Sequence, residues 1–290
     1  MRPPASSHSA PGHGWLTLAL ASLLCSCSPA EVTTVPEPPT SVAAGATAIP
    51  PQERERPLVF LDPGHGGEEL GAVGPSGAAE KDLVLDVALH TRRVLEEGGL
   101  VDVQLSRTVD EAVDLVRRPR MANAAGADLF VSLHMNSAGS PRARGLETYY
   151  LDTATDDAAE RLARRENLNV DDAPTELESI LADLRLAGNV GASRGLADRV
   201  HRQLVDSLSE FYGDDTLSDR GLRTALFAVL VRAEMPAVLV ELCFLSNTEE
   251  ERRARTRAYH EQVALAIAEG IIGFLRDEGR LPPPDPLAGP

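Results

Sequence analysis

Short apolar runs alternate with longer amphipathic segments between residues 58 and 275, and this alternation limits the possible folds more than any other feature of the sequence. The short runs are typical of buried strands, whereas the longer segments repeat apolar residues at the spacing of a helix face. Strands joined through helices are generally parallel, and parallel sheets are covered on both faces. The sequence therefore predicts an α/β fold with an open, mostly parallel twisted sheet flanked by helices on both faces.

The predicted strands are residues 58–61, 101–105, 129–133, a segment ending near 151, 225–231 and 237–245. The predicted helices are residues 80–97, 196–211 and 259–275. In addition, Ser246 and Glu249 have the spacing of a capping box, which predicts a further helical turn.

Residues 152–193 interrupt the alternation with ten acidic residues against four arginines. We expect this stretch to be an inserted helical segment with helices at 157–167 and 175–186, the second of which has one apolar face. Two interpretations stay open for the insertion, a solvated acidic surface or a lid over a functional site.

The N-terminal residues 1–27 have the pattern of a signal peptide. The apolar run at 15–24 matches a signal-peptide core and is too short to span a bilayer. It ends in Leu24-Cys25-Ser26-Cys27, which resembles a bacterial lipobox with Cys27 as the lipid-modified residue. An ordinary cleaved signal is the alternative, and both imply export. Because Ser28 follows Cys27, we expect a periplasmic protein anchored to the outer membrane.

Proline-rich segments flank the predicted catalytic domain at residues 58–279. Residues 28–57 contain seven prolines and too little apolar surface to fold, so we expect a disordered linker there and a disordered tail at 280–290. Once the signal is removed, Cys27 and Cys243 remain, so a disulfide framework is not expected.

The net charge excludes some classes of partner. With 28 basic and 44 acidic residues the formal charge is −16. Such a chain is poorly suited to neutralising the phosphates of nucleic acids or the headgroups of anionic lipids. We therefore expect no nucleic-acid partner, and membrane contact only through a lipid anchor at Cys27.

Two histidines directly follow predicted strands. His65 lies in Asp62–Gly67, a glycine-rich turn, and His134 lies in Ser132–Ser137. Ligands bind beyond the carboxyl ends of the strands in open α/β sheets, so these side chains can converge. Glu80 begins the first long helix, where the helix dipole alone also favours an acid. Two histidines with one carboxylate form a typical catalytic zinc set, which predicts a Zn²⁺ site at His65, Glu80 and His134.

Glu241 is the only charged residue in the apolar run 237–245. A carboxylate in a buried strand is costly unless it is paired or functional. Beside a metal site, Glu241 would act as a general base.

These residues belong to stretches that resemble the zinc-dependent N-acetylmuramoyl-L-alanine amidases of the Amidase_3 type, which split bacterial septa. The matching stretches are Asp62–Gly67, Glu80–Leu85, Ser106–Asp110, Asp128–Ser137, Gly145–Tyr150 and Met235–Asn247. The resemblance implies His65, Glu80 and His134 as zinc ligands and Glu241 as the catalytic residue. Met135 and Cys243 stand where the family commonly has a smaller residue and glycine.

The resemblance also implies a reaction and a form of regulation. The reaction is hydrolysis of the amide between N-acetylmuramic acid and L-alanine in peptidoglycan, during wall remodelling or daughter-cell separation. Some members carry an inserted helix that blocks the zinc until a protein activator displaces it, and residues 165–167 and 177–181 resemble that insertion. The carboxylate that reaches the metal would be Glu166, Glu176 or Glu178.

Two other functions use the same residues. Another zinc amide hydrolase, such as a peptidase or a deacetylase, has the same metal ligands. A catalytically inactive wall-binding lipoprotein is the second alternative, and the retention of all four site residues argues against it.

Overall fold

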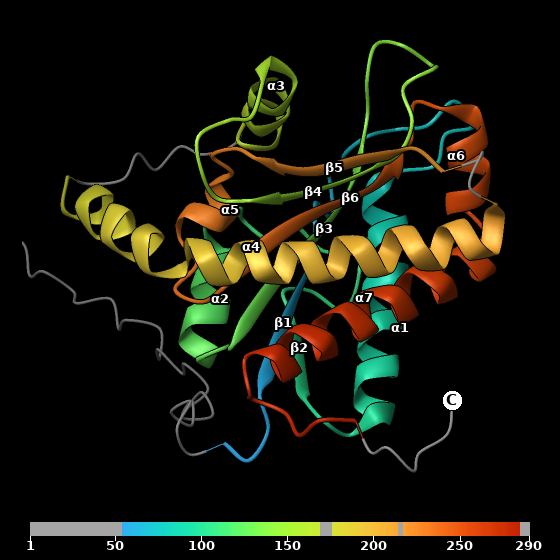
Figure 1. The fold of residues 1–290 in the computed structure, drawn as a ribbon. Coiled ribbons are helices and arrows are strands. Elements are labelled where there is room, and N and C mark those ends of the chain that lie inside the picture. Colours follow the sequence, from blue (N-terminus) through green and yellow to red (C-terminus); the bar gives the residue numbers. More distant parts are fainter. Residues whose placement is uncertain (1–53, 169–175, 214–216, 285–290) are drawn as a thin grey trace, which may run out of the picture. The chain divides into compact units, whose positions relative to one another are not determined.

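The computed structural model describes residues 54–168, 176–213 and 217–284, although the side chains of residues 176–187 are outside this description (Figure 1). The predicted signal peptide, the lipobox at Cys27 and almost all of the predicted linker lie outside the described residues. No helix in the described part is both long and apolar enough to cross a membrane.

The described residues form one six-stranded sheet. Its strands are β1 (Leu58–Pro63), β2 (Asp102–Leu105), β3 (Leu129–Asn136), β4 (Leu146–Tyr150), β5 (Asp219–Thr224) and β6 (Ala237–Phe244). The helices are α1 (Glu80–Gly98), α2 (Arg117–Ala125), α3 (Asp157–Glu166), α4 (Glu176–Tyr212), α5 (Ala228–Val231), α6 (Thr248–Ala254) and α7 (Arg257–Asp277).

The strand order is β2-β1-β3-β6-β4-β5. The pairs β1–β2, β1–β3, β3–β6 and β4–β5 are parallel, and only β4–β6 is antiparallel among the described strands. The predicted open, mostly parallel sheet is therefore confirmed. As a consequence, the carboxyl ends of β1, β3 and β6 meet at one edge of the sheet, which we call the carboxyl edge.

Alternate residues of the strands enter two separate cores. Val59 and Leu61 of β1 pack in the larger core with residues of α1, α4 and α7, which gather on one face of the sheet (Figure 1). Leu58 and Phe60 point into the smaller core, which includes residues of α2, α3 and α5. Helices thus cover both faces, as the strand–helix alternation predicts.

One predicted strand was wrong. Residues 225–231 were expected to form a strand, but β5 ends at Thr224 and residues 228–231 form the short helix α5. Phe227 and Leu230 are buried in the smaller core. The periodicity of a short apolar run cannot distinguish a buried strand from a buried helix, so the sequence did not show which of the two forms here.

The predicted helices 175–186 and 196–211 are one continuous helix, α4. Each glycine inside a helix costs about 1 kcal/mol, so Gly188, Gly191 and Gly195 weaken this junction. Packing offsets that cost, because Leu196, Val200 and Leu204 are completely buried in the larger core.

The short helices α6 and α2 also differ from the sequence prediction. The capped turn after β6 is α6, but its N-cap is Asn247 rather than Ser246, and the Asn247 side chain accepts from the backbone N–H groups of Glu249 and Glu250. Helix α2 was not predicted, because its sequence is mainly polar and carries Pro119 near its start. The predicted helix 157–167 is confirmed as α3.

Two glycines of α7 provide a matched test of the packing between α4 and α7. A Cβ on Gly270 would lie 2.7 Å from the Cα of Val200, whereas one on Gly273 would have its nearest neighbour at 3.8 Å. Gly270→Ala should therefore destabilise the fold by about 1–3 kcal/mol through overpacking. Gly273→Ala should stabilise it by up to about 1 kcal/mol through helix propensity. Chemical denaturation measures both, and equal shifts would contradict the packing described.

Candidate functional site

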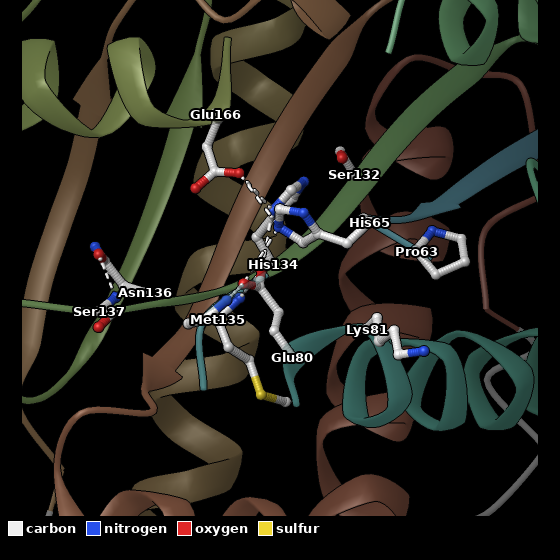
Figure 2. A network of polar contacts seen from close by, with 12 residues as sticks. Pro63, His65, Glu80, Lys81, Ser132, His134, Met135, Asn136, Ser137 and Glu166 are labelled. Atoms are coloured by element: carbon white, nitrogen blue, oxygen red, sulfur yellow. Dashed lines mark hydrogen bonds and ion pairs between the residues drawn. The ribbon is translucent and has the colours of Figure 1, made fainter. Parts of the chain in front are cut away.

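The three residues predicted as metal ligands lie together at the carboxyl edge of the sheet (Figure 2). His65 follows β1, His134 lies near the end of β3, and Glu80 is the first residue of α1. Their ligand atoms all lie within 4.8 Å of one another. The topology therefore brings together residues that are far apart in the sequence.

Glu80 is the centre of this group, and each of its oxygens has a defined set of neighbours. Oε1 accepts a 2.8 Å hydrogen bond from the Met135 backbone N–H and lies 3.0 Å from His134 Nδ1. Oε2 accepts from the Ala72 backbone N–H at 2.7 Å and lies 3.2 Å from His65 Nε2. One buried carboxylate thus joins α1, β3 and the loop before α1.

His65 and Glu80 shift each other's pKa. Burial alone would lower the pKa of His65, but the carboxylates of Glu80 and Glu166 raise it to about 10. Burial opposes ionisation of Glu80, yet His65 and His134 hold its pKa well below the ordinary value. In the absence of a metal, a protonated His65 therefore faces an ionised Glu80.

Backbone close to the side chains fixes the geometry of the site. A Cβ on Gly64 would lie 2.4 Å from Cε1 of His134, and one on Gly71 would lie 2.5 Å from Oε2 of Glu80. Gly71 also has a φ of +67°, which favours glycine. Both positions therefore require glycine for the chain to approach the candidate ligands.

Glu241 lies beside this group, in a row of residues paired across neighbouring strands of the sheet. On β6 it pairs in register with His134 of β3 on one side and with Glu147 of β4 on the other. It is completely buried, and neither carboxylate oxygen has a hydrogen-bond partner among the described residues. Burial, followed by the charges of Glu166 and Glu80, raises its pKa well above the ordinary value. A buried carboxyl group with a perturbed pKa and no hydrogen-bond partner among the described residues is a candidate functional group.

The donor set fits zinc. Two imidazole nitrogens and one carboxylate oxygen are ligands that zinc accepts, and three protein ligands leave a position for water or substrate. The Nε2 atom of His65 supports this fit, because it is buried and faces the carboxylates of Glu80 and Glu166 without a hydrogen bond of ordinary geometry to either.

Glu166, at the end of α3 in the insertion, reaches the same place (Figure 2). Its Oε2 lies 3.3 Å from Nε2 of His65 and 3.4 Å from Nδ1 of His134. The neighbouring Arg165 donates to the Ser137 carbonyl at 2.8 Å and contacts Glu166 Oε1 at 3.0 Å. Of the three carboxylates considered in the insertion, Glu166 therefore reaches the site, while the side chains of Glu176 and Glu178 lie outside the described residues.

Sequence reasoning missed Glu147 and its partners. Glu147 is buried, accepts from the Tyr149 hydroxyl at 2.7 Å and from Asn136 Nδ2 at 3.1 Å, and forms an ion pair with Arg220. The signal was available, because Glu147 is an acid in a buried strand exactly as Glu241 is. Its compensating partners on β3 and β5 were not visible in the sequence.

The two unusual residues beside the site leave its ligands in place. Met135 contributes its backbone N–H to Glu80, while its side chain is buried in the larger core. Cys243 is a free, buried cysteine whose thiol pKa is raised well above the ordinary value by burial.

Comparisons with known proteins agree with one another. The family model Amidase_3, described as N-acetylmuramoyl-L-alanine amidase, matches residues 59–273. The amidase AmiA of Salmonella typhimurium is 35% identical over 226 residues, which cover 75% of each chain. Among solved structures, the amidase AmiC2 of Nostoc punctiforme is 31% identical with a TM-score of 0.59, over 76% of this chain and 97% of that one.

The unpartnered burial of Glu241 predicts a gain in stability on substitution. Glu241→Gln keeps the shape of the side chain and removes its charge, so the metal-free variant should resist denaturant better than the metal-free wild type. Because the folded-state pKa of Glu241 is raised, the wild type loses stability as the pH rises above about 4.5, the pKa of an unfolded glutamate. The difference between the two proteins should therefore grow by up to about 1.4 kcal/mol per pH unit.

Chemical denaturation of both metal-free proteins at pH 5, 6.5 and 8 measures this difference. Groups that do not interact with residue 241 titrate alike in both proteins, so their contribution cancels. A difference that stays constant with pH would show that Glu241 is not held against ionisation.

Proposed function

The chain belongs to the Amidase_3 family of N-acetylmuramoyl-L-alanine amidases, and from this we propose that it cleaves peptidoglycan with the help of a zinc ion held by His65, Glu80 and His134. The protein is an N-acetylmuramoyl-L-alanine amidase, an enzyme that hydrolyses the amide between N-acetylmuramic acid and L-alanine. The zinc requirement and the role of each residue are the proposed part.

One observation carries the proposal, namely the convergence of the three ligand atoms beside an unpartnered buried carboxylate. Zinc bound there would act as a Lewis acid on the scissile carbonyl and would acidify water. Glu80 fixes the directions of both histidines, since its two oxygens face one ring each. The surrounding glycines keep the histidine rings and the backbone close together.

Glu241 supplies the proton transfer in this proposal. Its pKa is raised well above the ordinary value by burial, and a carboxylate with a raised pKa is a stronger base than an ordinary glutamate. Glu241 takes a proton from the attacking water and returns it to the leaving amine of L-alanine. Glu241 on β6 pairs directly with the candidate ligand His134 on the neighbouring strand β3.

Two variants separate metal binding from proton transfer. His134→Ala removes a ligand and should lose both stoichiometric zinc and activity. Glu241→Gln should retain zinc and lose activity by about 10²–10⁴-fold, the usual range for loss of a general base. Zinc content is measured after dialysis, and activity is measured as release of L-alanine-terminated stem peptides from purified sacculi.

Each variant can contradict its own part of the proposal. Stoichiometric zinc retained by His134→Ala at submicromolar free metal would remove His134 from the ligand set. Near-normal turnover of Glu241→Gln would assign Glu241 a structural role only.

We further propose that the insertion holds the enzyme in a closed state. Glu166 lies against the nitrogens of both histidines, where it would take the metal position that substrate needs. The interaction of Arg165 with the Ser137 carbonyl holds α3 against the end of β3. A protein activator that favours the open state by about 5.5 kcal/mol would convert a 1:99 mixture to 99:1.

Glu166→Ala should therefore raise the basal hydrolysis of sacculi without an activator. Glu160→Ala is the matched control, because Glu160 is on the same helix but is exposed, and its side chain pairs with Arg164 rather than with any candidate ligand. Replacement of residues 155–190 by a short Gly/Ser loop should have the same effect as Glu166→Ala. If both altered proteins fold, bind zinc and remain as slow as the parent, the insertion does not inhibit.

We also propose, from the sequence, where in the cell the enzyme is located. Residues 1–27 direct export, Cys27 carries a lipid, and the linker 28–57 lets the catalytic domain at 58–279 reach the wall from the outer membrane. This location suits wall remodelling or daughter-cell separation. Cys27→Ser should move the protein from the membrane fraction to the soluble periplasmic fraction, and unchanged partition would favour a simple cleaved signal.

A further inference from the structure

Three consecutive backbone carbonyls at the end of β1 accept hydrogen bonds from two buried arginines. Arg107 donates to the carbonyls of Pro63 at 3.1 Å and Gly64 at 2.8 Å. Arg118 donates to the carbonyls of Pro63 at 2.8 Å and His65 at 2.7 Å. We call these two side chains and three carbonyls the carbonyl clamp. It holds the loop that carries His65 without touching the imidazole of His65.

The clamp is itself fixed in place. The carboxylate of Asp62 accepts from Arg118 at 2.8 Å, from Ser106 Oγ at 2.6 Å and from Ser132 Oγ at 2.9 Å. Arg107 also reaches the carbonyl of Lys81 in α1 at 2.7 Å. Only 2% of the surface of each arginine is exposed. Buried arginines with this many partners have one orientation, so the carbonyls they bind are held as well.

The loop needs such support because His65 has an unfavourable backbone conformation. Its φ of 57° is the only positive φ at a non-glycine among the described residues. A conformation of this kind costs about 1–3 kcal/mol and persists only where the surroundings impose it. Without the clamp, the backbone at His65 would relax and its imidazole would leave the ligand group.

The same loop also confines the second histidine. The backbone of Gly64 packs directly on the His134 ring, as its blocked Cβ position shows. The Gly64 N–H donates to the Leu133 carbonyl at 3.0 Å, and the Gly64 carbonyl accepts from Arg107. A shift of Gly64 would therefore change the space available to the His134 ring as well as the direction of His65.

We infer that Arg107 and Arg118 are positioning residues that set the zinc affinity of this amidase by holding the loop of His65 and Gly64 in place. The inference rests on the proposed zinc site. Metal-binding histidines are usually oriented through a hydrogen bond to the ring, and loss of such a partner typically costs about 10–100-fold in metal affinity. Here Arg107 and Arg118 orient the imidazole of His65 by holding its backbone rather than by bonding to its ring.

Lysine is the informative substitution, because it keeps the positive charge and lacks the planar fork of donors. Arg118→Lys can still pair with Asp62 but cannot also reach the carbonyls of Pro63 and His65. Arg107→Lys alters the clamp without leaving Asp62 unpaired. Arg253→Lys is the control, since Arg253 is also largely buried but pairs with Glu249 on α6.

The zinc dissociation constant of each protein is measured by competition with a chelator. It is checked by the rise in unfolding temperature that a fixed zinc concentration gives over the same protein without metal. This second measurement compares each variant with itself, so a general loss of stability does not affect it. The visible spectrum of the cobalt-substituted proteins reports the geometry of the ligands.

Arg107→Lys and Arg118→Lys should weaken zinc binding by about 10–100-fold and alter the cobalt spectrum, while Arg253→Lys should do neither. Wild-type affinity and spectrum in both variants would overturn the inference and leave the zinc site intact. Variants that fail to fold even in saturating zinc would also overturn it, because the clamp would then serve the fold alone. Absence of zinc binding by the wild type would instead refute the proposed function.

Discussion

Carboxylates buried at the carboxyl edge of the sheet constrain this molecule most, because an ionised carboxylate without a partner costs several kcal/mol. Asp62 is stabilised by Arg118 and two serine hydroxyls, and Glu80 by two backbone N–H groups and by contacts with two histidines. Glu147 has a tyrosine, an amide and an arginine. Each of these networks joins segments that are distant in the sequence. Glu241 is the exception, because neither of its carboxylate oxygens has a hydrogen-bond partner among the described residues.

Much of this arrangement could be predicted from the sequence because it follows from local pattern. Strands such as 129–133 and the long helices show clear periodicity, and the sequence brings His65 and His134 to the carboxyl ends of strands, although β3 extends to Asn136 and so includes His134. What could not be predicted depends on packing between distant residues. The continuity of α4 is decided by burial against α7. Residues 228–231 form a helix rather than a strand because of how they pack in the smaller core.

The same limit applies to the site. Glu241 stood out because one charge in an apolar run is visible locally. Glu147 carries the same local signal, but its meaning depends on Tyr149, Asn136 and Arg220, which arrive from three different strands. The contact of Glu166 with both histidines depends likewise on how α3 folds back over the end of β3, a placement that periodicity does not encode.

The 37 residues of α4 include the last part of the insertion and a stretch packed in the larger core. At about 1.5 Å per residue, such a helix is a rod about 55 Å long. Its second half, from Leu196 onward, is packed in the larger core, and its first turns precede this packed half. A Cβ at Gly188 or Gly191 would meet no atom within 4 Å, whereas Asn189 between them donates a 3.1 Å hydrogen bond to the Glu234 carbonyl. Together with the 3.1 Å hydrogen bond from the Ala237 backbone N–H to Ser193 Oγ, this contact ties α4 to the start of β6 just before the helix enters the larger core.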